Sequence, residues 1–364
     1  MSLIAIRTDA SSSIGTGHVS RCLTLSHQLL KHGHEVVFLM RQLAGNMISQ
    51  VEHQGFRVHV LHTTMAANEE LNWTQDAKAC KEYLTHQSTP VGWLIVDHYQ
   101  LDSRWESAIN PSVKQIMVID DLANRQHHCQ ILLDQNLYHH SETRYRYLLD
   151  TNTRQLLGPR YVLLREEFLQ LPSLPRNYPK TVSKVIIYYG GSDPTGETLK
   201  AMEAFAGGQY KHINFSVVIG ASCADYERIK ARCAALSNFQ FHCQINNMAE
   251  MLSQTELAVG ACGSSTWERC YMGVPTLSTE IAENQSELSQ VLAEQGAIIN
   301  LGWYTQVNIE SLRKAFDQLL QNLQTLSEMS HMAHGLLHQD GYLGASYIAN
   351  LLNHIPANSE LSHG

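Results

Sequence analysis

The feature that most limits how this chain can fold is a regular alternation of short apolar segments with longer amphipathic ones. Residues 3–7 and 35–40 are predicted strands, and between them apolar residues from Val19 to Leu30 recur every three or four positions. Gly33 then ends the predicted helix. Strands that alternate with helices in this way favour parallel α/β layers.

The alternation runs twice, on either side of a proline-rich segment. Four of the nine prolines of this 364-residue chain fall between positions 159 and 179. The length also exceeds the roughly 250–300 residues at which single cores stop growing. We therefore predict an N-terminal α/β domain over 1–157, a linker over 158–182, a C-terminal α/β domain over 183–335, and a closing helix and tail over 336–364.

Charge and composition exclude several classes of protein. The formal net charge is -8 and no long basic run occurs, so we expect no nucleic-acid partner. No apolar stretch is long enough to span a bilayer, and no basic segment precedes an apolar one near the start. We expect a cytoplasmic monomer without a membrane partner. Most of the 20 histidines are scattered, and the pairs His127–His128 and His139–His140 lack His-x3-His spacing. No two of the eight cysteines are spaced as Cys-x2-Cys, and we predict no metal and no cofactor.

Three glycine-bearing turns follow predicted strands and open predicted helices. Glycine lets a backbone approach a ligand closely, and a helix start offers free N–H groups and the positive end of its dipole. None of the turns matches the NAD fingerprint or the P-loop. Each alone is equally typical of a tight strand–helix connection. Together they favour a nucleotide diphosphate in a cleft between the domains; the turns are 14–18, 190–193 and 260–265.

His18 directly follows Gly17 in the first turn of a predicted helix. The helix dipole disfavours a charged imidazolium there, and a neutral imidazole can act as a general base. A histidine that only caps the helix start would explain the position equally well.

Four aspartates lie at or just past the ends of predicted strands, at what we expect to be one edge of the sheet. Any of them could orient His18, although a lone aspartate in such a place is more often a helix cap or a turn former. They are Asp9, Asp97, Asp120 and Asp121.

Glu268 follows Ser265 as Ser-x-x-Glu, which is a capping-box pattern. The alternative is a carboxylate that holds the two ribose hydroxyls of a nucleotide. Asn284 and Gln285 follow the next predicted strand, where their amides could contact a sugar or cap a helix.

These segments resemble the signature of one family, the UDP-2,4-diacetamido-2,4,6-trideoxy-β-L-altropyranose hydrolases of pseudaminic acid biosynthesis. The likeness runs in order along nearly the whole chain, and it departs most clearly at Cys262, where a second glycine is expected. The matching segments are 7–10, 14–23, 96–99, 118–123, 133–136, 158–161, 190–194, 263–270 and 282–285.

The resemblance implies a GT-B architecture, in which two Rossmann-like domains face each other across a cleft. It also implies a metal-independent hydrolase that cleaves the anomeric C1–O bond of a UDP-sugar with inversion, with His18 as the base. Glu268, ahead of Gly273, corresponds to the ribose-binding glutamate of the lipid II N-acetylglucosaminyltransferase. The implied sugar contacts are Gly17, Tyr99, Glu283, Asn284 and Gln285, and the implied UDP contacts are Gly191, Ser192, Gly263, Ser264, Ser265 and Glu268.

Three other functions fit the same pattern. They are a glycosyltransferase that passes the sugar to an acceptor, a UDP-sugar 2-epimerase, and a nucleotide-sugar binding module without catalysis. The chain lacks an evident basic amphipathic stretch, which disfavours a lipid acceptor.

Overall fold

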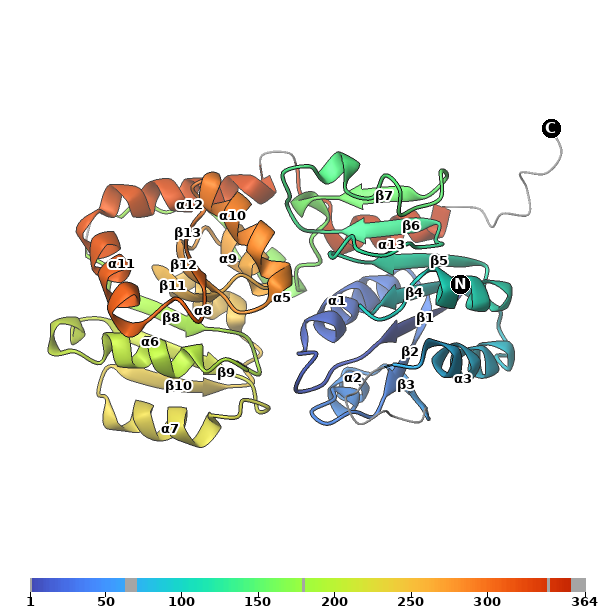
Figure 1. The fold of residues 1–364 in the computed structure, drawn as a ribbon, viewed down its shortest axis with the longest axis horizontal. Helices are drawn as coiled ribbons and strands as arrows, with labels where there is room; N and C mark the ends of the chain where they lie inside the picture. The colour runs from blue at the N-terminus through green and yellow to red at the C-terminus, as the bar shows by residue number, and fades with distance from the viewer. Residues whose placement is uncertain (1, 63–70, 179–180, 339–340, 355–364) are drawn as a thin grey trace. The chain divides into compact units, whose positions relative to one another are not determined.

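The chain forms two compact units, each described here by itself (Figure 1). The computed structural model describes residues 2–62, 71–178, 181–338 and 341–354. Unit 1 comprises Met1–Asn136, His140–Leu163 and Leu343–Gly364, and unit 2 comprises Leu137–His139 and Leu164–Tyr342. No helix in the described part of the chain combines the length and the apolar character needed to cross a membrane.

Unit 1 is built on a seven-stranded sheet with the order β3-β2-β1-β4-β5-β6-β7, and every neighbouring pair is parallel. The predicted α/β class is confirmed, and the strands predicted over 3–7 and 35–40 are both present. The strands are β1 (Leu3–Thr8), β2 (Glu35–Arg41), β3 (Arg57–Leu61), β4 (Val91–Asp97), β5 (Gln115–Ile119), β6 (Ile131–Asp134) and β7 (Arg154–Leu157).

Helices cover both faces of this sheet, because successive strand residues point to opposite sides. Ile4 and Ile6 pack with one set of helices, and Leu3 and Ala5 pack with the other. The first set is α1 (Gly17–Lys31), α2 (Ile48–His53) and α13 (Gly344–His354); the second is α3 (Trp73–Thr85) and α4 (Ser103–Ile109).

The last described helix, α13, belongs to unit 1, although the chain reaches it from unit 2. Its apolar side packs on α1, and the Trp93 indole nitrogen donates to the Leu352 carbonyl over 3.0 Å. The helix before it, α12 (Leu323–His338), runs past position 335, where we placed a domain boundary.

Unit 2 has a six-stranded sheet with the order β10-β9-β8-β11-β12-β13, again with parallel neighbours. The strands are β8 (Lys184–Tyr188), β9 (Asn214–Ile219), β10 (Phe239–Cys243), β11 (Leu257–Ala261), β12 (Thr276–Glu280) and β13 (Ile298–Trp303). The helices are α5 (Glu166–Leu169), α6 (Glu197–Phe205), α7 (Tyr226–Ala235), α8 (Met248–Gln254), α9 (Ser265–Tyr271), α10 (Ser286–Glu294), α11 (Ile309–Gln321) and α12.

Both sheets reverse their strand order at one place, between β1 and β4 in unit 1 and between β8 and β11 in unit 2. Ligands of open α/β sheets bind at the carboxyl ends of the strands at such a switch point. In unit 2 the two strands approach closely, since a Cβ on Gly260 would lie 2.1 Å from the Tyr188 carbonyl oxygen. The switch points are therefore the places where functional side chains are expected.

Candidate functional site

In unit 1 the helix that starts at the switch point has an open N-terminus. Helix α1 begins at Gly17, and its N-cap residue, Thr16, makes no side-chain capping hydrogen bond. The first turn also contains no acidic residue. His18 is therefore not a capping residue, and its side chain is directed elsewhere.

The His18 imidazole contacts Asp97, which lies 79 positions away at the end of β4. The distance between His18 Nδ1 and Asp97 Oδ1 is 2.6 Å, and both side chains are buried. The sequence left four aspartates as candidates for this role, and the structure assigns it to Asp97.

Two of the other candidate aspartates, Asp9 and Asp120, form ion pairs with arginines instead of contacting His18. Asp9 forms ion pairs with Arg7 at 2.8 Å and with Arg41 at 2.7 Å, inside the buried part of unit 1. Asp120 pairs with Arg125 at 2.8 Å and accepts a hydrogen bond from the Ala123 backbone. Asp120 thus stabilises the turn after β5, which is the structural alternative considered for it, whereas Asp9 is bound by arginines of β1 and β2.

Asp97 also forms a two-point ion pair with Arg21, one turn after His18 on α1. Arg21 Nε lies 2.6 Å from Oδ2, and Arg21 Nη2 lies 2.7 Å from Oδ1. Burial alone would raise the pKa of Asp97, but the charge of Arg21 and the hydrogen bonds from Arg21 and His18 outweigh it and hold the pKa far below its usual value. The carboxylate is therefore ionised and acts only as an acceptor.

This assignment fixes where the His18 proton lies. An ionised Asp97 accepts a hydrogen bond, so Nδ1 must be the ring nitrogen that carries the hydrogen. No hydrogen bond to His18 Nε2 is found among the residues that the structure describes. The lone pair of Nε2 is thus available to take a proton, which is the arrangement of a carboxylate-oriented general base.

Tyr99 packs against the same imidazole. The two ring centroids are 4.4 Å apart and the planes meet at 82°, an edge-to-face contact. The Tyr99 hydroxyl donates to Asp121 Oδ1 at 2.6 Å, and burial, with Asp121 beside it, raises the pKa of Tyr99. The structure thus brings Gly17, His18 and Tyr99 together; a sugar contact by Tyr99 stays a prediction.

In unit 2 the open helix start is that of α9, after β11. The capping-box interpretation is wrong: α9 begins at Ser265, its N-cap is Ser264, and no side chain caps it. Ser265 Oγ instead accepts a hydrogen bond from Arg269 at 3.0 Å. Within the described residues, no partner is found for the backbone N–H groups of Gly263, Ser264 and Ser265.

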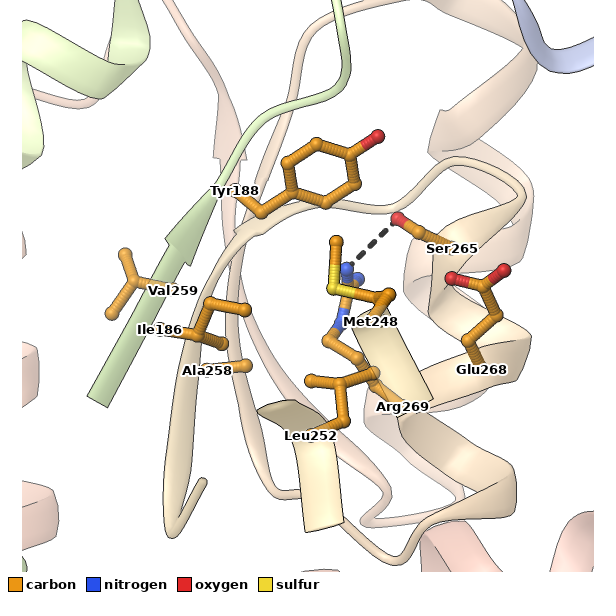
Figure 2. A pocket seen from close by; sticks show the side chains of 9 residues that line it. All are labelled: Ile186, Tyr188, Met248, Leu252, Ala258, Val259, Ser265, Glu268 and Arg269. Atoms are coloured by element: carbon orange, nitrogen blue, oxygen red, sulfur yellow. Dashed lines mark hydrogen bonds between the residues drawn. The ribbon is translucent and has the colours of Figure 1, made fainter. Parts of the chain in front are cut away.

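Without a capping role, the Glu268 carboxylate points toward Arg165. Arg165 Nε donates to Glu268 Oε1 at 2.9 Å, while Arg165 Nη1 lies 2.6 Å from Glu167. Glu268 also lines a small pocket between the sheet and helices α8 and α9 (Figure 2). The pocket is apolar apart from its α9 side; its residues are Ile186, Tyr188, Met248, Leu252, Ala258, Val259, Ser265, Glu268 and Arg269.

The other glycine turn of unit 2 is closed by a carboxylate. Asp193 accepts hydrogen bonds from the backbone N–H of Glu197 at 3.0 Å and of Thr198 at 2.8 Å. The start of α6 thus already holds an anion, which leaves less reason for a diphosphate there. The UDP contacts expected of Gly191 and Ser192 stay a prediction, with the α9 start as the more open of the two.

The segment predicted to contact the sugar forms the short 3-10 turn Glu283–Gln285 after β12. Gln285 Oε1 accepts from the Ile281 backbone at 3.1 Å, and its amide nitrogen lies 3.8 Å from where a Cβ on Gly263 would be. The structure therefore brings the Glu283, Asn284 and Gln285 turn beside the α9 start.

Two functional candidates were missed by the sequence reasoning, Arg21 and Arg165. Arg21 follows His18 by three positions, so helical periodicity places both on one face of α1, and that spacing was an available signal. Arg165 carried no such signal, because its partner Glu268 lies 103 positions away. Among the described residues, no cluster of three or more His, Cys, Asp or Glu side chains could hold a metal ion.

The fold is that of the GT-B glycosyltransferases. The crystal structure of MurG from Acinetobacter baumannii aligns with a TM-score of 0.66 at 14% identity, over 98% of this chain and 100% of that one. The calicheamicin glycosyltransferase aligns with a TM-score of 0.61 at 13% identity, over 96% of each chain. At these identities the likeness concerns the fold alone.

No family model matches the chain. Among curated proteins it is 23% identical to the UDP-2,4-diacetamido-2,4,6-trideoxy-β-L-altropyranose hydrolase of Campylobacter jejuni, over 80% of this chain and 97% of that protein. It is 29% identical to the spore coat polysaccharide biosynthesis protein SpsG of Bacillus subtilis, over 48% of this chain. An uncharacterized protein of Methanocaldococcus jannaschii is 24% identical over 78% of this chain. The chain spans about half the length of these last two relatives, 51% and 57% respectively.

Proposed function

We propose that this protein is a UDP-sugar hydrolase that cleaves the anomeric C1–O bond with inversion. The observation that carries the proposal is the His18–Asp97 pair, with Nδ1 bound to a buried carboxylate at 2.6 Å and Nε2 left to act as a base. Two findings support it: the GT-B fold, and the 23% identity to a hydrolase of a UDP-linked diacetamido sugar.

His18 performs the proton transfer in this mechanism. Nε2 removes a proton from a water molecule as its oxygen attacks C1 of the sugar. The C1–O bond to the diphosphate breaks, its electron pair leaves on the UDP oxygen, and the new hydroxyl forms on the opposite face. Asp97 stabilises the imidazolium that results, and it does so without taking the proton itself.

Unit 2 holds the leaving group in this proposal. The unpaired N–H groups of Gly263 to Ser265 and the α9 dipole meet the charge of the diphosphate, and Glu268 binds the ribose hydroxyls. UDP is a good leaving group once its charge is balanced, so no separate general acid and no metal is required. The chain's net charge of -8 favours such local binding over attraction by a basic surface.

The proposed substrate is UDP-2,4-diacetamido-2,4,6-trideoxy-β-L-altropyranose, with UDP and the free sugar as products, in pseudaminic acid biosynthesis. The alternative is a glycosyltransferase that uses the same base to activate an acceptor hydroxyl. This alternative is supported by the fold, because the structural neighbours are glycosyltransferases. A UDP-sugar 2-epimerase would break the same bond.

An NMR time course in buffer, with the purified protein and this UDP-sugar beside UDP-N-acetylglucosamine, separates these activities. Release of UDP with a free sugar of inverted anomeric configuration supports the hydrolase. Release only after an acceptor is added supports the transferase, and a changed C2 configuration supports the epimerase. Binding without any release would contradict all three and leave a nucleotide-sugar binding module.

A further inference from the structure

The hydrogen bonds around Asp97 involve a residue that the proposed reaction does not use directly. Arg21 makes two short contacts with the Asp97 carboxylate, at 2.6 and 2.7 Å, and a third with Asp121 Oδ2 at 3.2 Å. The Arg21 side chain is only 7% exposed, and Asp97 is fully buried. An arginine buried at this depth against two carboxylates is a fixed part of the site.

We propose that Arg21 is a positioning residue whose permanent charge balances Asp97, so that the His18 proton stays on Nδ1 and Nε2 stays open to accept one. The rate consequence rests on the proposed function, while the proton position does not.

The physical reason lies in the number of charges. A buried carboxylate needs a cation, because its charged form is costly to remove from water. With Arg21 in place, Asp97 already has one, and His18 can remain neutral. Without Arg21, the nearest group able to carry a positive charge beside Asp97 is His18 itself, as an imidazolium. An imidazolium has no lone pair and cannot act as a base.

The contact between Arg21 and His18 agrees with this role. Arg21 Nη2 lies 3.2 Å from His18 Nδ1, and both also lie within 2.7 Å of the same oxygen, Asp97 Oδ1. Since Asp97 is ionised, both nitrogens donate to it, and neither donates to the other. One carboxylate oxygen thus receives a guanidinium hydrogen and an imidazole hydrogen together.

The other groups around His18 add one more charge. Tyr99 contributes an uncharged ring from the segment after β4, and the Cys22 thiol donates to Asp97 Oδ2 at 3.5 Å. Asp121, after β5, is held behind Arg21 and receives the Tyr99 hydroxyl. Asp97, Asp121 and Arg21 together therefore carry one net negative charge beside a neutral His18.

The first test needs no substrate. Protein with 15N-labelled histidine is studied by NMR near neutral pH, and the His18 signals are assigned by their loss in His18→Gln. Wild type and Arg21→Lys, which keeps the cation, should show a neutral ring protonated on Nδ1. Arg21→Gln should show a ring protonated on both nitrogens, and a neutral Nδ1–H ring in this variant would overturn the proposal.

Further variants test the proposal even if Arg21→Gln does not fold. In the double variant Arg21→Gln/Asp97→Asn both charges are gone, so it should fold better than Arg21→Gln; equal or worse folding counts against the counterion role. An imidazolium in Arg21→Lys overturns the proposal whatever the other variants do. Arg57→Gln, which breaks an exposed ion pair with Glu35, is the matched control and should leave the His18 signals unchanged.

The second test uses the proposed reaction. Arg21→Gln should lower kcat near neutral pH by roughly ten- to a thousandfold, since an opposite charge at this range shifts a titration by about 1–3 pH units. KM should change little, and activity should recover as the pH is raised. A pH-independent loss would indicate a merely structural role and count against the proposal. If wild type shows no turnover, the proposed function fails, and the NMR result still decides on Arg21.

Discussion

The two units have the same strand order at their switch points, yet they leave different helix starts open. In unit 1 the helix after the first strand, α1, is uncapped, while α4 is capped by Asp102. In unit 2 the helix after the first strand, α6, is held by Asp193, while α9 after β11 is uncapped. Of the two helices that follow the switch-point strands, each unit therefore leaves one start open, at the place where ligands of this fold bind.

The residues around the two open starts differ in kind. At α1 the surroundings are ionic, with Arg21, Asp97 and Asp121 packed around His18. At α9 they are bare backbone and small side chains, with Glu268 and Arg165 beside them. One topology thus provides a place for proton transfer in one unit and a place for an anion in the other, which suggests that mutations in the two units should affect different quantities.

The largest effect is expected from His18→Ala in unit 1. Loss of the base should lower kcat by about 10²–10⁴-fold, while the affinity for UDP changes little. Steady-state kinetics and calorimetric titration with UDP check the two quantities separately. His53→Ala, at an exposed position of α2, is the control. Wild-type turnover in His18→Ala would contradict the assignment of proton transfer to unit 1.

A pair of glycine variants tests the backbone character of unit 2. Gly260→Ala should destabilise the fold by about 1–3 kcal/mol or more, because its Cβ would lie 2.1 Å from the Tyr188 carbonyl oxygen. Gly263→Ala should keep the stability, since the nearest atom to its Cβ is 3.8 Å away.

The same pair separates folding from binding. In Gly263→Ala the added methyl group lies at the proposed diphosphate position, so UDP affinity should fall by roughly ten- to a hundredfold. Urea denaturation and UDP titration measure the two effects. Unchanged UDP binding by Gly263→Ala would argue against the α9 start as the diphosphate site.

Glu268→Gln should raise KM and weaken UDP binding by roughly tenfold or more, since a hydrogen bond to a charged group contributes about 1.5–3 kcal/mol. Its effect on kcat should be smaller than that of His18→Ala, because the ribose does not react. Titration with UDP and with 2′-deoxy-UDP gives the measurement, and the deoxy compound should lose most of its disadvantage in the variant. Glu250→Gln, on the exposed side of α8, serves as control. Equal loss of kcat in both glutamate variants would contradict the assignment.

The smallest expected effect is a difference in pH dependence between one aspartate of each unit. The charge of Arg21 and the hydrogen bonds from Arg21 and His18 outweigh burial and lower the pKa of Asp97 below the unfolded value of 3.8. The stability that the ionised Asp97 contributes is therefore present above pH 3.8 and is lost as the pH falls further. Burial raises the pKa of Asp193, so wild type should gain stability through that group as the pH falls toward 3.8.

Urea denaturation at several pH values, with Asp97→Asn and Asp193→Asn as the variants, checks both signs. The stability difference between wild type and Asp97→Asn should shrink in acid, and that between wild type and Asp193→Asn should grow in favour of wild type. Parallel behaviour of the two variants would show that the two carboxylates have the same environment after all.

The sequence by itself determined the order of strands and helices and the places where glycine turns open helices. Those features depend on local patterns: apolar periodicity, a stop at Gly33, and the short apolar runs over 3–7 and 35–40 that form β1 and β2. It also placed four aspartates at strand ends. Helices α7, α8 and α10 were not predicted from the sequence, and most of the stability of such short helices comes from packing rather than from their own periodicity.

Only the tertiary structure decided which of these residues act together. Asp97 is the partner of His18 because β4 lies beside β1 in the sheet. Asp9 and Asp120 instead form ion pairs with Arg7 and Arg125. The same holds for Ser265 and Glu268, whose local pattern predicts a capping box but whose side chains bind Arg269 and Arg165 instead. Local spacing fixes what a residue can do, but charge partners tens of positions apart in sequence are chosen by the sheet that brings them together.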